Sequence, residues 1–138
     1  MSARAWILLT LAASLAAAPA AQAKLQVTLA ISNRIPAVKE PVRAVITTEP
    51  AQAHCRMRLL AVAPKVDIYK ALNALAIRPS PRLGFYVRLA RTSPKQWRGT
   101  VRFGRTGLWK LVIPNWCVGG YAQPPPIIQR VSVHAPGP

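Results

Sequence analysis

The chain has 138 residues, of which 19 are Lys or Arg and three are Asp or Glu, so its formal net charge is +16. This length provides for one domain with one hydrophobic core and excludes a large multidomain assembly. With three acidic residues and two histidines, the chain also has few groups suited to acid–base catalysis.

Residues 1–23 have the pattern of a secretory signal peptide. Arg4 precedes an apolar, Ala-rich stretch (5–18), and an Ala-x-Ala site ends at Ala23. The stretch is shorter than the roughly 20 residues that a membrane span needs. We therefore expect cleavage after Ala23 and a mature domain of residues 24–138 in the periplasm, cell envelope or medium. That domain would have no transmembrane segment, and loss of Arg4 lowers its net charge to +15.

Apolar residues that alternate with a period of two predict about seven β-strands in the mature chain. The expected strands are 25–31, 42–48, 55–62, 84–92, 97–103, 109–113 and 127–134. The hairpin over 97–113 is the expected centre of the domain. Its inward residues are predicted to be Trp97, Gly99, Val101, Phe103, Trp109, Leu111 and Ile113.

One segment, 64–77, changes to the period of a helix. Asp67 is a candidate N-cap, and Ile68, Leu72 and Leu75 follow at spacings of four and three. The two prolines in 78–82 end the helix, because neither can continue it. We expect this short helix to cross from one sheet to the other.

Cys55 and Cys117 are the two cysteines of the chain. In an exported protein this pair predicts one disulfide. Closing so long a loop would stabilise the fold by roughly 4 kcal/mol. A metal-binding pair of thiols is the alternative.

Together these elements predict a mainly β protein, an immunoglobulin-like antiparallel β-sandwich of about seven strands with one short crossover helix and one disulfide. The cysteine spacing is similar to that of the inter-sheet bridge of immunoglobulin domains. No Trp follows shortly after Cys55, so Trp97 and Trp109 are expected to fill the core in its place.

The pattern W-x-G-x-V-x-F-x-x-x-G-x-W-x-L-x-I-P over 97–114 resembles the C-terminal hairpin of small exported immunoglobulin-like domains. The YtkA-like and CopC-like groups of bacterial extracytoplasmic proteins are examples. The resemblance implies an immunoglobulin-like fold and a link to copper handling or surface binding. This chain lacks the Met- and His-rich segments of copper carriers, so no copper residues are carried over from the family.

A cluster of soft ligands nevertheless offers a second hypothesis, extracytoplasmic copper handling. His54, Cys55 and Met57 are close in sequence, and His134 is the one further imidazole. Thiolate and thioether ligands suit Cu(I). On a strand Cys55 and Met57 share a face while His54 points away, and oxidation of Cys55 would leave no thiolate. The alternative is a disulfide cysteine, a core methionine and a loop histidine, and we expect no metal or other cofactor.

Six basic residues occupy positions expected to point outward from four strands. They are Arg56, Arg58, Arg88, Arg98, Arg102 and Lys110. If these strands share a sheet, the six form an anion-binding face, since arginine binds phosphate and carboxylate through paired hydrogen bonds. If the strands belong to different sheets, the residues are ordinary solvated positions.

The loop 114–126 is a candidate partner-binding segment, because it holds Trp116, Tyr121 and a triple proline. The prolines favour an extended polyproline conformation, which suits recognition and equally suits a stiff surface loop.

No catalytic constellation is recognisable. The sequence has no P-loop, dinucleotide fingerprint, zinc spacing or nucleophile elbow. We therefore expect a non-enzymatic binding module whose basic surface engages an anionic envelope polymer, an anionic surface or a protein partner. Nucleic acid is not an expected partner outside the cytoplasm. A purely structural role in the envelope is a further alternative.

Overall fold

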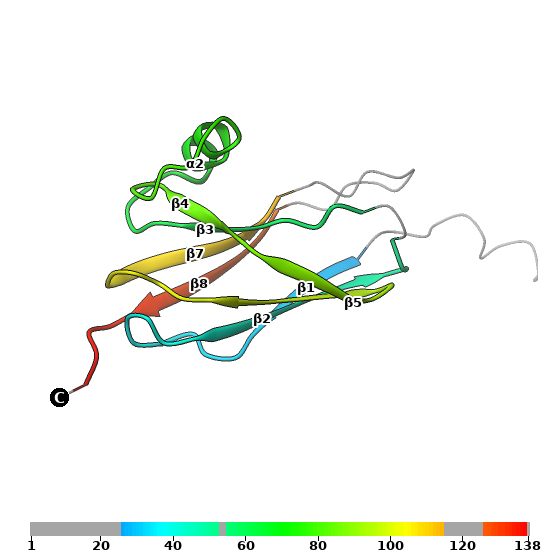
Figure 1. The fold of residues 1–138 in the computed structure, drawn as a ribbon, viewed down its shortest axis with the longest axis horizontal. Helices are drawn as coiled ribbons and strands as arrows, with labels where there is room; N and C mark the ends of the chain where they lie inside the picture. Colours follow the sequence, from blue (N-terminus) through cyan, green and yellow to red (C-terminus); the bar gives the residue numbers. More distant parts are fainter. Residues whose placement is uncertain (1–25, 53–54, 115–125, 138) are drawn as a thin grey trace, which may run out of the picture.

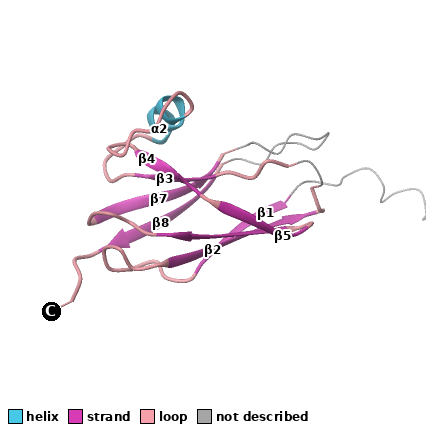
Figure 2. Ribbon diagram, in the orientation of Figure 1, coloured by secondary structure: helices cyan, strands magenta, loops and turns pink. Residues whose placement is uncertain are grey.

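A computed structural model describes residues 26–52, 55–114 and 126–137 as two antiparallel sheets packed face to face (Figures 1 and 2). The first sheet has the order β1-β2-β6-β5 and the second the order β4-β3-β7-β8. The strands of the first are β1 (Gln26–Ile31), β2 (Val42–Glu49), β6 (Gln96–Val101) and β5 (Leu89–Ser93). Those of the second are β4 (Gly84–Val87), β3 (Leu59–Val62), β7 (Gly107–Ile113) and β8 (Ile127–Val133). The predicted signal peptide lies outside the described residues.

The core lies between the sheets and follows the predicted alternation. Trp97 and Trp109, 5% and 3% exposed, both belong to it, as the sequence predicts. Phe103 is fully buried, and its ring centroid lies 5.2 Å from that of Trp109. On the other side Phe85 meets Trp109 edge-on at 5.9 Å. These aromatic contacts join β4 and β7 to the segment that follows β6.

The helix α2 (Ile68–Leu75) covers the outer face of the second sheet. Asp67 caps it as predicted, because the carboxylate accepts a hydrogen bond from the Lys70 N–H at 3.1 Å. Ala71 and Leu75 pack on a second apolar cluster whose strand members are Leu60, Val62 and Val112. The strand β3 is therefore buried on both faces.

The expectation that the helix crosses between the sheets is wrong. The helix joins β3 to β4, which pair with each other in the second sheet. The chain changes sheets at Arg88 instead, so the predicted strand 84–92 is two strands, β4 and β5, and the described residues form eight strands in all. Gly99 makes room for the change, since a Cβ there would lie 2.7 Å from the Arg88 carbonyl oxygen.

The third strand is also shorter than predicted. It begins at Leu59, and Cys55 lies in the segment before it, half-buried against the core. No free cysteine is found in the described part of the chain. Cys117 lies outside that part, so its pairing with Cys55 stays a prediction. Within the described ranges, no helix is long and apolar enough to cross a membrane.

Candidate functional site

The six basic residues predicted to form one face are distributed over both sheets. Arg98 points outward from β6 in the first sheet, and Lys110 points outward from β7 in the second. The other four lie between strands: Arg56 and Arg58 before β3, Arg88 between β4 and β5, and Arg102 after β6. The two outer faces of a sandwich point in opposite directions, so the six residues do not share one face.

Part of the predicted set faces solvent on the first sheet. Arg98 lies opposite Val45 in the β2–β6 register, and Arg43 lies opposite Thr100. Arg43 and Arg98 border a shallow hollow of about 470 Å³ on this face. This hollow has no acidic residue among its described lining, so it presents positive charge alone.

A larger pocket, about 790 Å³ in volume, lies where the segment after α2 meets β4 and the β6–β7 connection. We call it the arginine pocket and define it by Arg78, Arg102, Arg105, Phe85, Tyr86 and Trp109. The segment after α2 and the β6–β7 connection lie at the same end of the sandwich, on the left in Figure 1. The volume is typical of pockets that bind small molecules.

Two connections supply the arginines of this pocket. Arg78 directly precedes Pro79 and follows the last turn of α2, where its N–H bonds to the Ala74 carbonyl oxygen at 3.3 Å. Arg102 and Arg105 belong to the short connection from β6 to β7. All three arginines are exposed.

The floor of the pocket is aromatic and fixed by hydrogen bonds. The Trp109 indole Nε1–H donates to the Arg105 carbonyl oxygen at 2.9 Å, and the Arg105 guanidinium lies 5.6 Å from the centroid of the same ring. A second bond holds this side chain, from Arg105 Nη2 to the Arg82 carbonyl oxygen at 2.9 Å. Arg102 Nη1 donates to the Lys39 carbonyl oxygen at 3.2 Å. A guanidinium carries five N–H donors, so donors remain on each for an anion.

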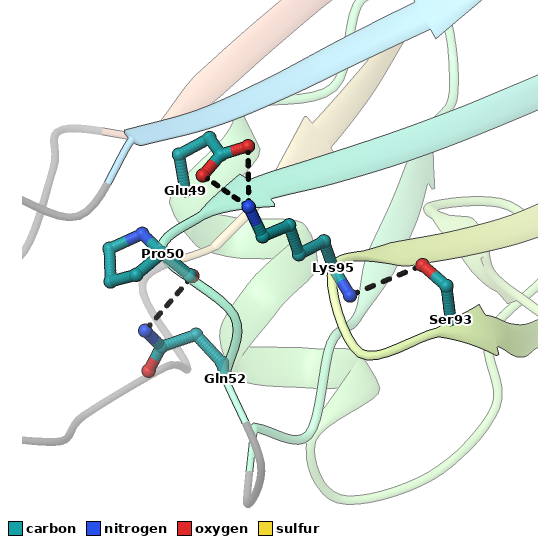
Figure 3. A network of polar contacts seen from close by, with 5 residues as sticks. All are labelled: Glu49, Pro50, Gln52, Ser93 and Lys95. Carbon is teal, nitrogen blue, oxygen red and sulfur yellow. Dashed lines mark hydrogen bonds and ion pairs between the residues drawn. The ribbon is translucent and has the colours of Figure 1, made fainter.

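None of the described residues that line the arginine pocket is acidic. The three carboxylates of the chain are engaged elsewhere. Glu49 forms an ion pair with Lys95 at 2.8 Å, in the network of Figure 3 that also holds Gln52 against the Pro50 carbonyl. Glu40 accepts the Ala37 N–H at 2.7 Å. The third, Asp67, caps the helix.

The residues of the copper hypothesis are not brought together in the described structure. His54 lies outside the described residues, and Met57 packs against the core. Both ring nitrogens of His134 lie against carbonyl oxygens, those of Ala135 and Ile35. His134 follows Val133, which pairs with Gly107 at the start of β7. Met57 precedes β3, whose residue Leu60 pairs with Val112 near the end of β7. The two side chains therefore lie at opposite ends of the second sheet. No group of three metal-binding side chains occurs among the described residues.

Sequence reasoning found Arg102 but missed Arg78 and Arg105. Arg78 lies in the proline segment that ends the helix and Arg105 lies between two glycines, and the signal that marks them is an arginine in each of two connections. Trp116 and Tyr121, the predicted partner-loop residues, lie outside the described residues.

A search against protein-family models finds no match for this chain. A search of curated proteins finds no significant relative. The resemblance of the hairpin 97–114 to YtkA-like and CopC-like domains therefore remains a likeness of pattern.

Proposed function

We propose that this protein is an exported, non-enzymatic binding module whose basic surface engages an anionic polymer or surface of the cell envelope. The observation that carries the proposal is the local engagement of all three carboxylates. Glu49 forms an ion pair, Glu40 accepts a hydrogen bond within a loop, and Asp67 caps the helix. The excess positive charge is therefore not balanced within the domain.

The distribution of charge supports a broad rather than a single contact. Arg43 and Arg98 face solvent on the first sheet, Lys110 and Arg130 are opposite each other on the second, and the arginine pocket is at one end. Like charges on neighbouring strands repel, and an external anion relieves that repulsion. A flexible polymer can contact several such places at once, whereas a small ion can contact one.

The strand order supports the proposed immunoglobulin-like fold. In an immunoglobulin constant domain the first, second, fifth and fourth strands make one sheet and the third, sixth and seventh make the other. With β4 counted as an added edge strand, the orders β1-β2-β6-β5 and β3-β7-β8 are the same. The proposed disulfide differs from the immunoglobulin bridge, because Cys55 lies after β2 rather than within it.

The proposal is tested by binding to immobilised dextran sulfate at increasing salt. We expect the affinity to fall at least about tenfold between about 0.05 and 0.3 M NaCl, because added ions screen exposed charges and compete for them. The double variant Arg43→Gln/Arg98→Gln should bind more weakly and show a smaller dependence on salt. Neutral dextran is the control and should not bind.

Two results would contradict the proposal. An affinity that does not change with salt would show that charge is not what holds the polymer. Absence of binding at low salt would favour the structural role in the envelope.

A further inference from the structure

The arginine pocket differs in kind from the rest of the basic surface. A solvated charged face offers cations but no apolar cavity, whereas here three arginine residues and three aromatic residues line one hollow of about 790 Å³. Ile77, which is 84% exposed, and the two prolines of 78–82 add apolar surface at its edge. The site therefore combines the two features of a pocket for a small molecule, an apolar body and a few convergent polar groups.

We propose that the arginine pocket binds a small amphiphilic oxyanion, a molecule with an aromatic or acyl body and a carboxylate, sulfonate or phosphate head. This inference deepens the proposed function, because it names the ligand class of one part of the basic surface. The body would lie against Phe85 and the apolar edge formed by Ile77, Pro79 and Pro81, and the head would meet the guanidinium groups.

The aromatic floor suits the body of such a ligand. Phe85 and Trp109 are fixed in an edge-on pair, and Trp109 is held by its bond to the Arg105 carbonyl oxygen. Fixed rings bind without losing side-chain freedom, which favours affinity.

The arginines of the pocket suit the anionic head of such a ligand. Arg102 and Arg105 are each anchored by one hydrogen bond to a backbone carbonyl, so their planes are oriented before any ligand arrives. Guanidinium groups bind oxyanions through parallel N–H bonds, and such charge-assisted bonds are stronger than neutral ones. With no acidic side chain among the described lining residues, no carboxylate in the pocket competes for these donors.

Gly104 offers a position at which bulk can be added to the pocket lining without changing its charge. Gly104 lines the pocket, and a Cβ added there meets no atom within 4 Å. Its backbone does not have a positive φ, so a larger residue is tolerated. Gly137, in the C-terminal segment, is equally open and provides a matched control. We compare Gly104→Leu with Gly137→Leu.

Three probes distinguish the contribution of the apolar body to binding from that of the anionic head. Anilinonaphthalenesulfonate has both parts, phenylnaphthylamine has the same body without the sulfonate, and sodium sulfate supplies the head alone. Fluorescence titration of the purified protein should show one site for the sulfonate and at least about tenfold weaker binding of the neutral amine. Sulfate should not displace the sulfonate more than chloride does at equal ionic strength.

The variants locate the site. Gly104→Leu should weaken sulfonate binding at least about tenfold, because the side chain occupies the cavity, while Gly137→Leu leaves it unchanged. The double variant Arg78→Gln/Arg105→Gln should bind the sulfonate probe more weakly and the neutral amine as tightly as before. The double variant Arg43→Gln/Arg98→Gln, on the first sheet, should bind both probes with unchanged affinity. Circular dichroism and the melting temperature confirm that each variant is folded.

Equal affinities for sulfonate and amine, or sulfonate binding that Gly104→Leu does not alter, would overturn this inference. Its failure is distinguishable from failure of the proposed function. Gly104→Leu should keep its salt-dependent binding to dextran sulfate. Arg43→Gln/Arg98→Gln should lose part of that binding but should still bind the sulfonate probe in the arginine pocket.

Discussion

Trp109 and Arg105 contact each other in two ways. The indole N–H of Trp109 donates to the backbone carbonyl oxygen of Arg105 at 2.9 Å, and the Arg105 guanidinium lies 5.6 Å from the centroid of the same ring. A buried indole N–H needs such an acceptor. The backbone of the β6–β7 connection is thereby tied to the core, and Arg105 is held in the lining of the arginine pocket.

Trp109→Phe should destabilise the protein by about 1 to 3 kcal/mol. The smaller ring keeps the aromatic contacts in part, but it loses the hydrogen bond and leaves a small cavity. Urea unfolding measures the change. Arg105→Ala is the control, because it removes the guanidinium and retains the carbonyl acceptor. If the two variants were equally destabilised, the backbone bond would not be the important part of this contact.

Gly99→Ala should destabilise the protein by about 1 to 3 kcal/mol, as expected where an added methyl group forces a backbone to shift. The new Cβ would lie 2.7 Å from the Arg88 carbonyl oxygen, at the point where the chain passes from β4 to β5. Gly104→Ala, with open space around its Cβ, should stay within about 0.5 kcal/mol of the parent protein. Equal stability of all three proteins in urea would show that the crossing is not tightly packed.

The crossing at Arg88 shows why the sequence could not predict the whole topology. Alternation from Phe85 to Leu89 is unbroken, and both sheets bury residues on the same period, so a change of sheet leaves no local mark. The glycine that permits it is on β6, a different strand. In contrast, the period of two and the Asp67 cap depend on neighbours in sequence, and both were predicted correctly.

The arginine pocket follows the same reasoning. Arg102 could be selected from the sequence because it continues the alternation of β6. Arg78 and Arg105 belong to turns far apart in the chain, and only the packing of α2 on the second sheet brings their connections to one end. Arg98 and Lys110 lie on opposite faces because their strands belong to different sheets. The sequence around each residue does not reveal which strands pair.

The predicted disulfide gives a mass that can be measured. The exported protein, purified without reductant and treated with an alkylating agent, should begin at Lys24, remain unalkylated and be lighter by two hydrogen atoms than the dithiol. Reduction should then lower the free energy of unfolding by about 4 kcal/mol, since the loop it opens is long. Two alkylated thiols, or a metal ion retained in the native mass spectrum, would favour copper handling instead.

Thr48→Val should raise the free energy of unfolding by about 1 kcal/mol. Thr48 is fully buried in β2, and its hydroxyl has no hydrogen-bond partner among the described residues. Valine has nearly the same shape and removes the unsatisfied group, while the Thr48 backbone N–H keeps its bond to the Lys95 carbonyl oxygen.

Thr47→Val is the matched control for this change. Thr47 is the neighbouring residue on β2, is half-buried and points to the opposite face, so its replacement should alter stability by no more than about 0.5 kcal/mol. Urea unfolding of both variants gives the comparison. A loss of stability in Thr48→Val but not in Thr47→Val would mean that the buried hydroxyl is hydrogen-bonded in solution, for instance to an internal water.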